Sequence, residues 1–255
     1  MTEEGENAVA AERRKTVVLT GGSRGIGHAT VKRFSEAGWR VITCSREDIP
    51  EECKRDPNWS DHIRADLADP KSVDEFAEKA KALIGGEGLD ALVNNAAQSP
   101  KTSYKERLGC LNGDLAGWRV VFELNFFVAL TLSRAFAGDL HRAGGAIVNI
   151  TSIAGHTLHP FAGSAYSTSK AALSALTREM AVEFAELGVR VNAVAPGEIA
   201  TEMVGPEYES LIPRIPLSRM GTSEEVASVV FQMCQSDFSY VTGSEVFVTG
   251  GQHLL

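Results

Sequence analysis

The feature of this sequence that most constrains its fold is a regular alternation of short apolar runs, rich in β-branched residues, with longer segments of helical periodicity. Strands that alternate with helices at this spacing are typical of βαβ units, which build a parallel sheet with right-handed crossovers. The runs expected as strands are 15–20, 40–45, 62–66, 90–96, 145–152, 189–196 and 244–251. The segments expected as helices are 25–38, 72–84 with a serine cap, 114–140, 164–188 and 223–235.

The alternation continues to the end of the chain without a linker, an internal repeat or a low-complexity stretch. A chain of 255 residues that is 44% hydrophobic can bury one large core. We therefore predict a single α/β domain over residues 15–255. Residues 1–14 are polar, and we expect them to form a flexible N-terminal arm, as chain termini often do.

Composition excludes some classes of partner. The net charge of −8 argues against nonspecific binding to nucleic acid or to an anionic membrane surface. The first fifteen residues, MTEEGENAVAAERRK, resemble neither a signal peptide nor a transit peptide. No apolar run is expected to approach the ~20 residues that a membrane helix needs. We expect a cytoplasmic protein with no membrane partner and no nucleic-acid partner.

Cysteine and histidine give little support for a metal site. The four cysteines are scattered without a CxxC pair, which favours free thiols in a reducing compartment. His156 and His159 are three residues apart, but no third ligand is evident nearby. We expect both histidines to be loop residues or substrate contacts, and we predict no metal.

The first expected strand ends in a glycine-rich turn, TGGSRGIG, from Thr20 to Gly27. Gly21, Gly25 and Gly27 let the chain turn sharply off the strand and let the backbone approach a ligand closely. They open a helix whose N-terminus attracts phosphate. The spacing is G-x-x-x-G-x-G rather than G-x-G-x-x-G, but the same physics predicts a pyrophosphate-binding turn.

Further short motifs follow this turn in a fixed order, and together they resemble those of the short-chain dehydrogenase/reductase family. They are ADL at 65–67, NNAA at 94–97, Asn125, Ser152, YSTSK at 166–170 and PGEIAT at 196–201. The resemblance implies a doubly wound, Rossmann-type domain with a seven-stranded parallel sheet flanked by helices on both faces. It also implies a nicotinamide cofactor and the interconversion of a carbonyl and an alcohol.

The YSTSK motif is expected to lie in a helix, where residues i and i+4 share one face, so Tyr166 and Lys170 can point into one site. Reduction of a ketone needs a proton on oxygen, and a neighbouring ammonium should lower the phenol pKa from its ordinary ~10. The resemblance implies that Tyr166 is the general acid or base and that Lys170 lowers its pKa and binds the nicotinamide ribose. Ser152 would steady the substrate oxygen, and Asn125 would hold a water that relays protons through Lys170.

The resemblance also implies a bed for the cofactor. Asp66 and the Leu67 backbone would meet the adenine, Asn94 and Ala96 the adenosine ribose, and Pro196 and Gly197 the nicotinamide. Ala97 stands where many relatives have glycine. The expected cofactor-binding residues are Thr20, Gly21, Ser23, Arg24, Gly25, Ile26, Gly27, Ser45, Arg46, Asp66, Leu67, Asn94, Ala96, Tyr166, Lys170, Pro196, Gly197, Ile199 and Thr201.

The end of the second expected strand decides between NADP and NAD. An acidic residue at this place binds the 2′-hydroxyl of NAD. Here the family spacing places Ser45 at that position, followed by Arg46, and both suit a 2′-phosphate, as does Arg24. A register shift of two residues would instead place Glu47 or Asp48 on the ribose. We predict NADP(H), with NAD(H) as the alternative.

We predict an oxidoreductase that acts on a small carbonyl or alcohol substrate. The alternatives are an NAD-dependent alcohol dehydrogenase, an inactive nucleotide-binding regulator, and an epimerase or dehydratase of the wider family. The substrate class stays open between an oxoacyl thioester, a sugar or polyol, and a steroid. Segments 98–114 and 198–218 are the expected specificity walls. The surplus of apolar residues on 114–140 and on 165–187 predicts a homotetramer or homodimer.

Overall fold

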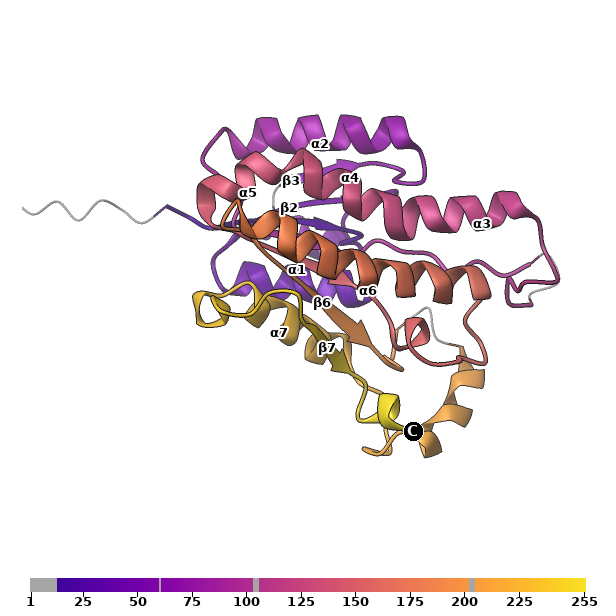
Figure 1. Cartoon of the computed structure of the whole chain (residues 1–255). Helices are drawn as coiled ribbons and strands as arrows, with labels where there is room; N and C mark the ends of the chain where they lie inside the picture. The colour runs from indigo at the N-terminus through magenta and orange to yellow at the C-terminus, as the bar shows by residue number, and fades with distance from the viewer. Residues whose placement is uncertain (1–12, 60, 103–105, 202–204) are drawn as a thin grey trace, which may run out of the picture.

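The fold is described by a computed structural model that covers residues 13–59, 61–102, 106–201 and 205–255. Its centre is a seven-stranded, fully parallel sheet in the order β3-β2-β1-β4-β5-β6-β7 (Figure 1). The strands are β1 (Thr16–Thr20), β2 (Arg40–Ser45), β3 (Asp61–Arg64), β4 (Ala91–Asn94), β5 (Ala146–Ile150), β6 (Arg190–Pro196) and β7 (Glu245–Val248). The predicted sheet of seven parallel strands is confirmed.

Helices cover both faces of the sheet, so the predicted doubly wound fold is also confirmed. Figure 1 shows α2, α4, α5 and α6 above the sheet and α1 and α7 below it. The helices are α1 (Gly25–Glu36), α2 (Pro70–Ile84), α3 (Leu115–Phe122), α4 (Val128–Ala135), α5 (Ala137–Ala143), α6 (Ser164–Ala185) and α7 (Ser223–Met233).

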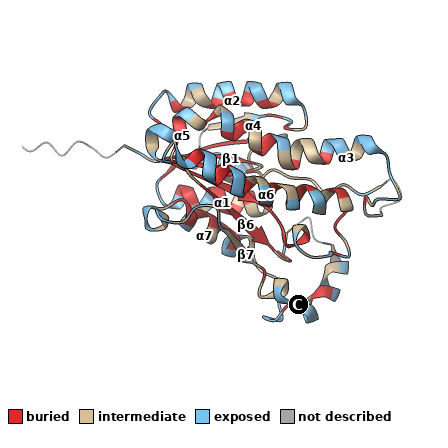
Figure 2. Ribbon diagram, viewed as in Figure 1, coloured by how far each residue is buried: buried red, intermediate tan, exposed pale blue. Residues whose placement is uncertain are grey.

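Each face of the sheet has its own apolar core, because strands buried on both faces need cover on both sides. On the upper face, Phe76, Leu132 and Met180 come from α2, α4 and α6. On the lower face, Phe34 of α1 meets Phe231 of α7 edge-on, with ring centroids 5.1 Å apart. Figure 2 shows the result as buried strands between helices whose outer faces are exposed.

The sheet order places a crevice at the carboxyl ends of β1 and β4. β1 pairs with β2 on one side and with β4 on the other. The connection that leaves β1 therefore runs toward β2, and the connection that leaves β4 runs in the opposite direction, toward β5. Ligands of open α/β sheets bind outside the carboxyl ends of the strands at such a reversal.

The start of α2 differs from the prediction. The helix begins at Pro70 rather than at Ser72, and Asp69 caps it by accepting a hydrogen bond from the Lys71 N–H at 3.1 Å. Proline suits the first helical position because its missing N–H would have no partner there. The Ser72 hydroxyl instead accepts a hydrogen bond from the Asp66 N–H at 3.1 Å, which fixes the end of the β3 loop.

The long helix predicted over 114–140 is interrupted twice. A short π-helical segment, η2 (Glu123–Phe127), which we call the π-turn, separates α3 from α4. Phe136 leaves the helical conformation between α4 and α5. A π-turn accommodates one extra residue in a helix and is frequent at functional sites. The periodicity of the sequence could not reveal it, because the apolar pattern continues through the insertion.

The helical stretch Leu115–Ala135 is the one such stretch in the described chain that could cross a membrane, by length and composition only. The expectation that no apolar run approaches this length is therefore wrong. The stretch nevertheless contains α4, whose inner side packs into the upper core beside α2 and α6.

The predicted N-terminal arm falls mostly outside the described residues. Its last two residues, Arg13 and Arg14, contact the domain, and the flexibility of the arm stays a prediction. The Arg13 guanidinium forms an ion pair with Asp90 at 2.6 Å, and the Arg14 guanidinium donates hydrogen bonds to Gly38 O and Asn58.

Candidate active site

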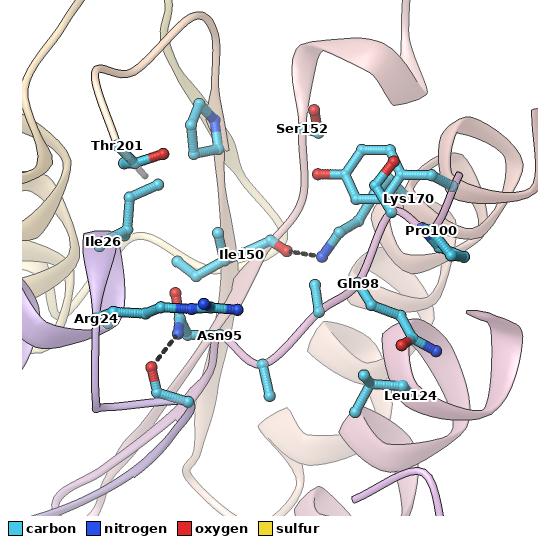
Figure 3. Close-up of a pocket in the computed structure, with 18 of the residues that line it drawn as sticks. Arg24, Ile26, Asn95, Gln98, Pro100, Leu124, Ile150, Ser152, Lys170 and Thr201 are labelled. Atoms are coloured by element: carbon cyan, nitrogen blue, oxygen red, sulfur yellow. Dashed lines mark hydrogen bonds between the residues drawn. The ribbon is translucent and has the colours of Figure 1, made fainter. Parts of the chain in front are cut away.

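A cavity of about 540 Å³ opens at the carboxyl ends of the strands. In Figure 3, Arg24, Ile26 and Thr201 lie on one side of it and Ser152, Lys170 and Pro100 on the other. The cavity brings together most of the residues predicted from the sequence. These are Gly21, Ser23, Arg24, Gly25, Ile26, Gly27, Ser45, Arg46, Asp66, Leu67, Ala96, Ser152, Tyr166, Lys170, Pro196, Gly197, Ile199 and Thr201.

The glycine-rich turn fits a phosphate group. Gly25 has a φ of +55°, a conformation that L residues rarely adopt. A Cβ on Gly27 would lie 2.0 Å from Gly21 O, so only glycine lets the two parts of the turn touch. No side chain caps α1, and its first turn has no acidic residue. The N–H groups at this helix end, together with the positive end of the helix dipole, suit the pyrophosphate of a dinucleotide.

Thr20 and Asn94 were predicted to contact the cofactor, but neither lines the cavity. The Thr20 hydroxyl accepts hydrogen bonds from the N–H groups of Asn95 and Ala96 at 3.0 Å, so it holds the end of β4 against β1. The Asn94 side chain is buried and donates to Asn149 Oδ1 at 2.9 Å, which ties β4 to β5. The prediction for Asn94 is corrected because the alternation of side chains along β4 turns it into the core.

Asn95, which the sequence analysis did not select, is the asparagine that reaches the cavity. Its Nδ2 donates to Thr20 O at 2.9 Å and to Gly21 O at 3.1 Å, and Figure 3 draws one of these bonds. This side chain therefore sets the shape of the glycine-rich turn. The doubled Asn in NNAA was the available signal, since consecutive strand residues point to opposite faces.

Asn125 lies within the π-turn and also stays behind the cavity wall. Its Oδ1 accepts from the Gln98 N–H at 2.9 Å, and its Nδ2 donates to Gln98 O at 3.0 Å and to Ser169 Oγ at 3.1 Å. The side chain thus fixes the segment after β4 to α6 next to Lys170. Its proposed role in holding a water stays a prediction.

Tyr166 and Lys170 face the same cavity from one side of α6, and Ser152 faces it from the end of β5. The Lys170 Nζ lies 5.9 Å from the Tyr166 ring centroid and donates to Ile150 O at 2.6 Å (Figure 3). Burial lowers the pKa of Lys170 to about 7, because desolvation disfavours its charged form.

The pKa of Tyr166 is shifted in the direction opposite to the prediction. Burial raises it, the hydrogen bond with Ser152 acts in the lowering direction, and the negative charge of Glu198 raises it further. Lys170 is not among the groups that shift it. An amine whose own pKa is reduced to about 7 is a weak source of positive charge, which accounts for the difference.

The part of the cavity predicted to hold the adenosine contains Ser45 at the end of β2, Arg46 and Glu47 directly after it, and Asp66 after β3. The Ser45 hydroxyl donates to Glu47 O at 2.6 Å, and this bond curls the chain so that all three residues reach the cavity. Asp48 does not line it. Neither Arg24 nor Arg46 forms an ion pair with another described residue.

The opposite end has a wall of side chains that comes in part from segment 198–218, which was predicted to form a specificity wall. His159, Phe161, Glu198 and Tyr208 all line the cavity, and we call this set the substrate wall. The Glu198 carboxylate accepts from His159 Nε2 at 2.7 Å and from Gln252 Nε2 at 3.2 Å. The rings of Phe161 and Tyr208 pack with centroids 4.8 Å apart.

The two histidines that suggested a metal go to different partners. His156 Nε2 lies 3.1 Å from Glu245 Oε2, whereas His159 pairs with Glu198. Within the described residues, no cluster of three or more His, Cys, Asp or Glu side chains is placed to hold a metal ion. Three of the described cysteines, Cys44, Cys53 and Cys234, are buried, and Cys110 is exposed.

Comparison with known proteins identifies a family and relatives to which this chain is similar. A family model described as Enoyl-(Acyl carrier protein) reductase matches residues 21–253. Protein FixR of Bradyrhizobium diazoefficiens is 50% identical over 242 residues, which cover 94% of this chain and 87% of FixR.

Two solved structures share the fold and carry a nucleotide. An oxidoreductase of the short chain dehydrogenase/reductase family from Brucella ovis, in complex with a partially ordered NAD, is 47% identical with a TM-score of 0.81. The alignment covers 93% of this chain and all of that one. The RhlG/NADP active-site complex of Pseudomonas aeruginosa is 30% identical with a TM-score of 0.82, covering 94% of this chain and 96% of that one.

Proposed function

The chain belongs to the short-chain dehydrogenase/reductase family of oxidoreductases that act on CH–OH groups with a nicotinamide cofactor, and from this premise we propose that it interconverts a ketone and a secondary alcohol with NADP(H). The observation that carries the proposal is the convergence of Ser152, Tyr166 and Lys170 on one cavity. The same cavity contains the uncapped N-terminus of α1, which suits a dinucleotide.

The bound nicotinamide would supply the hydride that reaches the carbonyl carbon. Ser152 would hold the carbonyl oxygen by donating a hydrogen bond to it, and the Tyr166 phenol would give that oxygen its proton. The raised pKa of Tyr166 keeps the phenol protonated, which suits the reduction direction. Lys170, held by Ile150 O, lies beside Tyr166 and would restore its proton after turnover.

The test is oxidation of NADPH and NADH by purified protein with a panel of ketones. Turnover of any ketone supports the proposal. An inactive regulator would bind cofactor without turnover on the panel. An epimerase would convert a hydroxylated substrate without net oxidation of the reduced cofactor.

The preference for NADP(H) rests on Arg24 and Arg46, which line the cavity without an ion-pair partner among the described residues. Two guanidinium groups suit a 2′-phosphate. Glu47 lines the same cavity and would suit the 2′-hydroxyl of NAD instead, and the Brucella ovis relative carries NAD. We give the two arginines the greater weight because a phosphate can bind both of them.

The ratio of kcat/KM for NADPH over NADH tests this preference. We expect it to favour NADPH and to fall in Arg46→Ala by roughly 1.5–3 kcal/mol, as for a hydrogen bond to a charged group. Arg55→Ala, an exposed arginine outside the cavity, is the control and should leave the ratio unchanged. A wild-type ratio in favour of NADH would assign the ribose to Glu47.

We also propose that the protein is a homotetramer or homodimer located in the cytoplasm. Leu115 on α3 is 69% exposed and Val182 on α6 is 74% exposed, and Val120 and Phe127 are also exposed. The faces of these helices are apolar and uncovered, as expected for a subunit interface. A single 27.3 kDa species in light scattering would contradict the proposal. Cell fractionation tests the location.

A further inference from the structure

The buried carboxylate of Glu198 has no role in the chemistry described above. Glu198 is 5% exposed and lies directly after Gly197 in the cavity wall. Its negative charge raises the pKa of Tyr166, which opposes use of the phenol as a base. A buried charge is costly to keep unless it has a partner, and this one also opposes ionisation of Tyr166.

One oxygen of Glu198 is fixed by the protein. Oε1 accepts from His159 Nε2 and from Gln252 Nε2. His159 in turn accepts the N–H groups of Phe161 and Ala162 on Nδ1, at 3.2 and 3.0 Å, so its ring proton must lie on Nε2 and point at the carboxylate. The loop after β5 and the C-terminal segment thus hold this carboxylate in one orientation.

The other oxygen is available to a ligand. Oε2 makes no hydrogen bond with any described residue, although an ionised carboxylate has about four acceptor sites. Glu198 lines the same cavity as Tyr166 and Ser152. An acceptor held rigidly in the wall of this cavity, with half of its capacity unused, suits a hydrogen-bond donor on the substrate.

Tyr208 adds the complementary group. It lines the same cavity, and its ring packs against His159 and Phe161 with centroids 5.8 and 4.8 Å away. Burial, followed by the charge of Glu198, raises the pKa of Tyr208 to about 12. The phenol therefore stays protonated and can donate. A donor and an acceptor in one wall suit a hydroxyl group, which both donates and accepts, better than an ammonium group, which only donates.

We propose that Glu198 and Tyr208 select substrates with a hydroxyl group near the reacting carbonyl, so that the enzyme reduces hydroxyketones to diols. The hydroxyl donates to Glu198 Oε2 and accepts from the Tyr208 phenol. The hydride from the reduced nicotinamide reaches the carbonyl carbon, the Tyr166 proton reaches the carbonyl oxygen, and the oxidised cofactor and a diol leave. This inference rests on the proposed ketone reductase activity and specifies its substrate class.

The test compares 2-hydroxycyclohexanone with cyclohexanone as kcat/KM in the wild type, Glu198→Gln and Tyr208→Phe. The amide that replaces the carboxylate in Glu198→Gln can still accept from His159 and Gln252, but it presents an N–H where Oε2 accepted. The wild type should prefer the hydroxyketone, and Glu198→Gln should reduce the preference about 10- to 150-fold, the range for a hydrogen bond to a charged group. Tyr208→Phe should reduce it by about 3- to 10-fold. The ratio cancels any change in the pKa of Tyr166, which affects both ketones alike.

Glu75→Gln on the exposed face of α2 is the matched control and should keep the wild-type ratio. An unchanged ratio in Glu198→Gln with turnover of both ketones overturns this inference alone, whereas no turnover of any ketone overturns the proposed activity. A wild-type preference for the cation 1-methyl-4-piperidone over both other ketones, lost in Glu198→Gln, would replace the hydroxyl by an ammonium group. If Glu198→Gln does not fold, Tyr208→Phe decides, and an unchanged ratio there overturns the proposal.

Discussion

The two ends of the cavity differ in the groups that form them. The cofactor end, formed by the glycine-rich turn and the ends of β1, β2 and β4, consists mainly of backbone groups and small residues held in fixed contact. The substrate wall of His159, Phe161, Glu198 and Tyr208 consists of side chains from two connections, the first between β5 and α6 and the second between β6 and α7. The first end is fixed by the fold, whereas the second can change without altering the sheet. Substitutions at the cofactor end should therefore change cofactor affinity, and substitutions in the substrate wall should change KM for the ketone, each without the other effect.

The largest effect should come from Tyr166, the proposed proton donor. Tyr166→Phe keeps the ring and removes the proton, so kcat should fall by ~10²–10⁴-fold, the range for general acid–base catalysis. Cofactor affinity, measured by titration calorimetry, should stay within about twofold. Turnover above a tenth of wild type would remove Tyr166 from its assigned role.

A substitution of Gly27 in the glycine-rich turn should lower cofactor affinity, because the contacts within the turn leave no room for a side chain there. In Gly27→Ala the new Cβ would lie 2.0 Å from Gly21 O and 2.5 Å from Asn95 Nδ2, so the backbone of the turn must move. Overpacking of this kind costs about 1–3 kcal/mol, which corresponds to up to about 100-fold in cofactor affinity.

Gly138→Ala in α5 is the matched control, since its Cβ would meet only the Arg142 guanidinium at 3.9 Å. It should leave cofactor affinity unchanged. Equal affinity loss in the two variants would show that the glycine-rich turn has no special rigidity.

Lys170 should give the protein a measurable pH dependence of stability. Its pKa is about 7 in the folded protein against 10.5 when unfolded, so between these values the unfolded chain binds one more proton. The free energy of unfolding therefore rises with pH in this window, by about 2 kcal/mol from pH 7 to pH 9. Urea unfolding at both pH values should show the rise in the wild type and not in Lys170→Met. A rise of the same size in the variant would assign it to other groups.

The smallest effect should come from Phe161 in the substrate wall. Phe161→Ala removes one half of an aromatic pair, worth about 0.5–1.5 kcal/mol, and should raise KM for ketones by roughly 2- to 10-fold. Cofactor affinity should not change, because this side chain belongs to the other end of the cavity. A parallel loss of cofactor affinity would show that the two ends are coupled.

The same contrast explains what could be predicted from the sequence. The sheet, its order of elements and the glycine-rich turn follow from periodicity and from residues whose backbone freedom is required, such as Gly25 and Gly27. The motif residues also reached one cavity, apart from Thr20, Asn94 and Asn125. Those three are buried polar groups that act through hydrogen bonds behind the wall, and a motif does not distinguish such a support from a contact.

The sequence indicated the region of the substrate wall, through His159 and segment 198–218, but not the contacts within it. Glu198, His159 and Gln252 are far apart in the sequence, and only the folded loops bring them together. The raised pKa of Tyr166 was missed for the same cause, since the nearby carboxylate and the degree of burial depend on tertiary structure. Asn95 could have been found by applying strand alternation to NNAA.

The π-turn at 123–127 also sets the rotation of one helix half against the other. In an α-helix each residue adds about 100° of rotation, so if the same residues of Leu115–Ala135 formed a continuous α-helix without the π-turn, α3 would be rotated by about that angle relative to α4. Leu115 and Val120 would then face a new direction, and Asn125 would lose its hydrogen bonds with the backbone of Gln98. The π-turn thus determines both the direction of an outer apolar surface and the position of the chain beside the reacting groups.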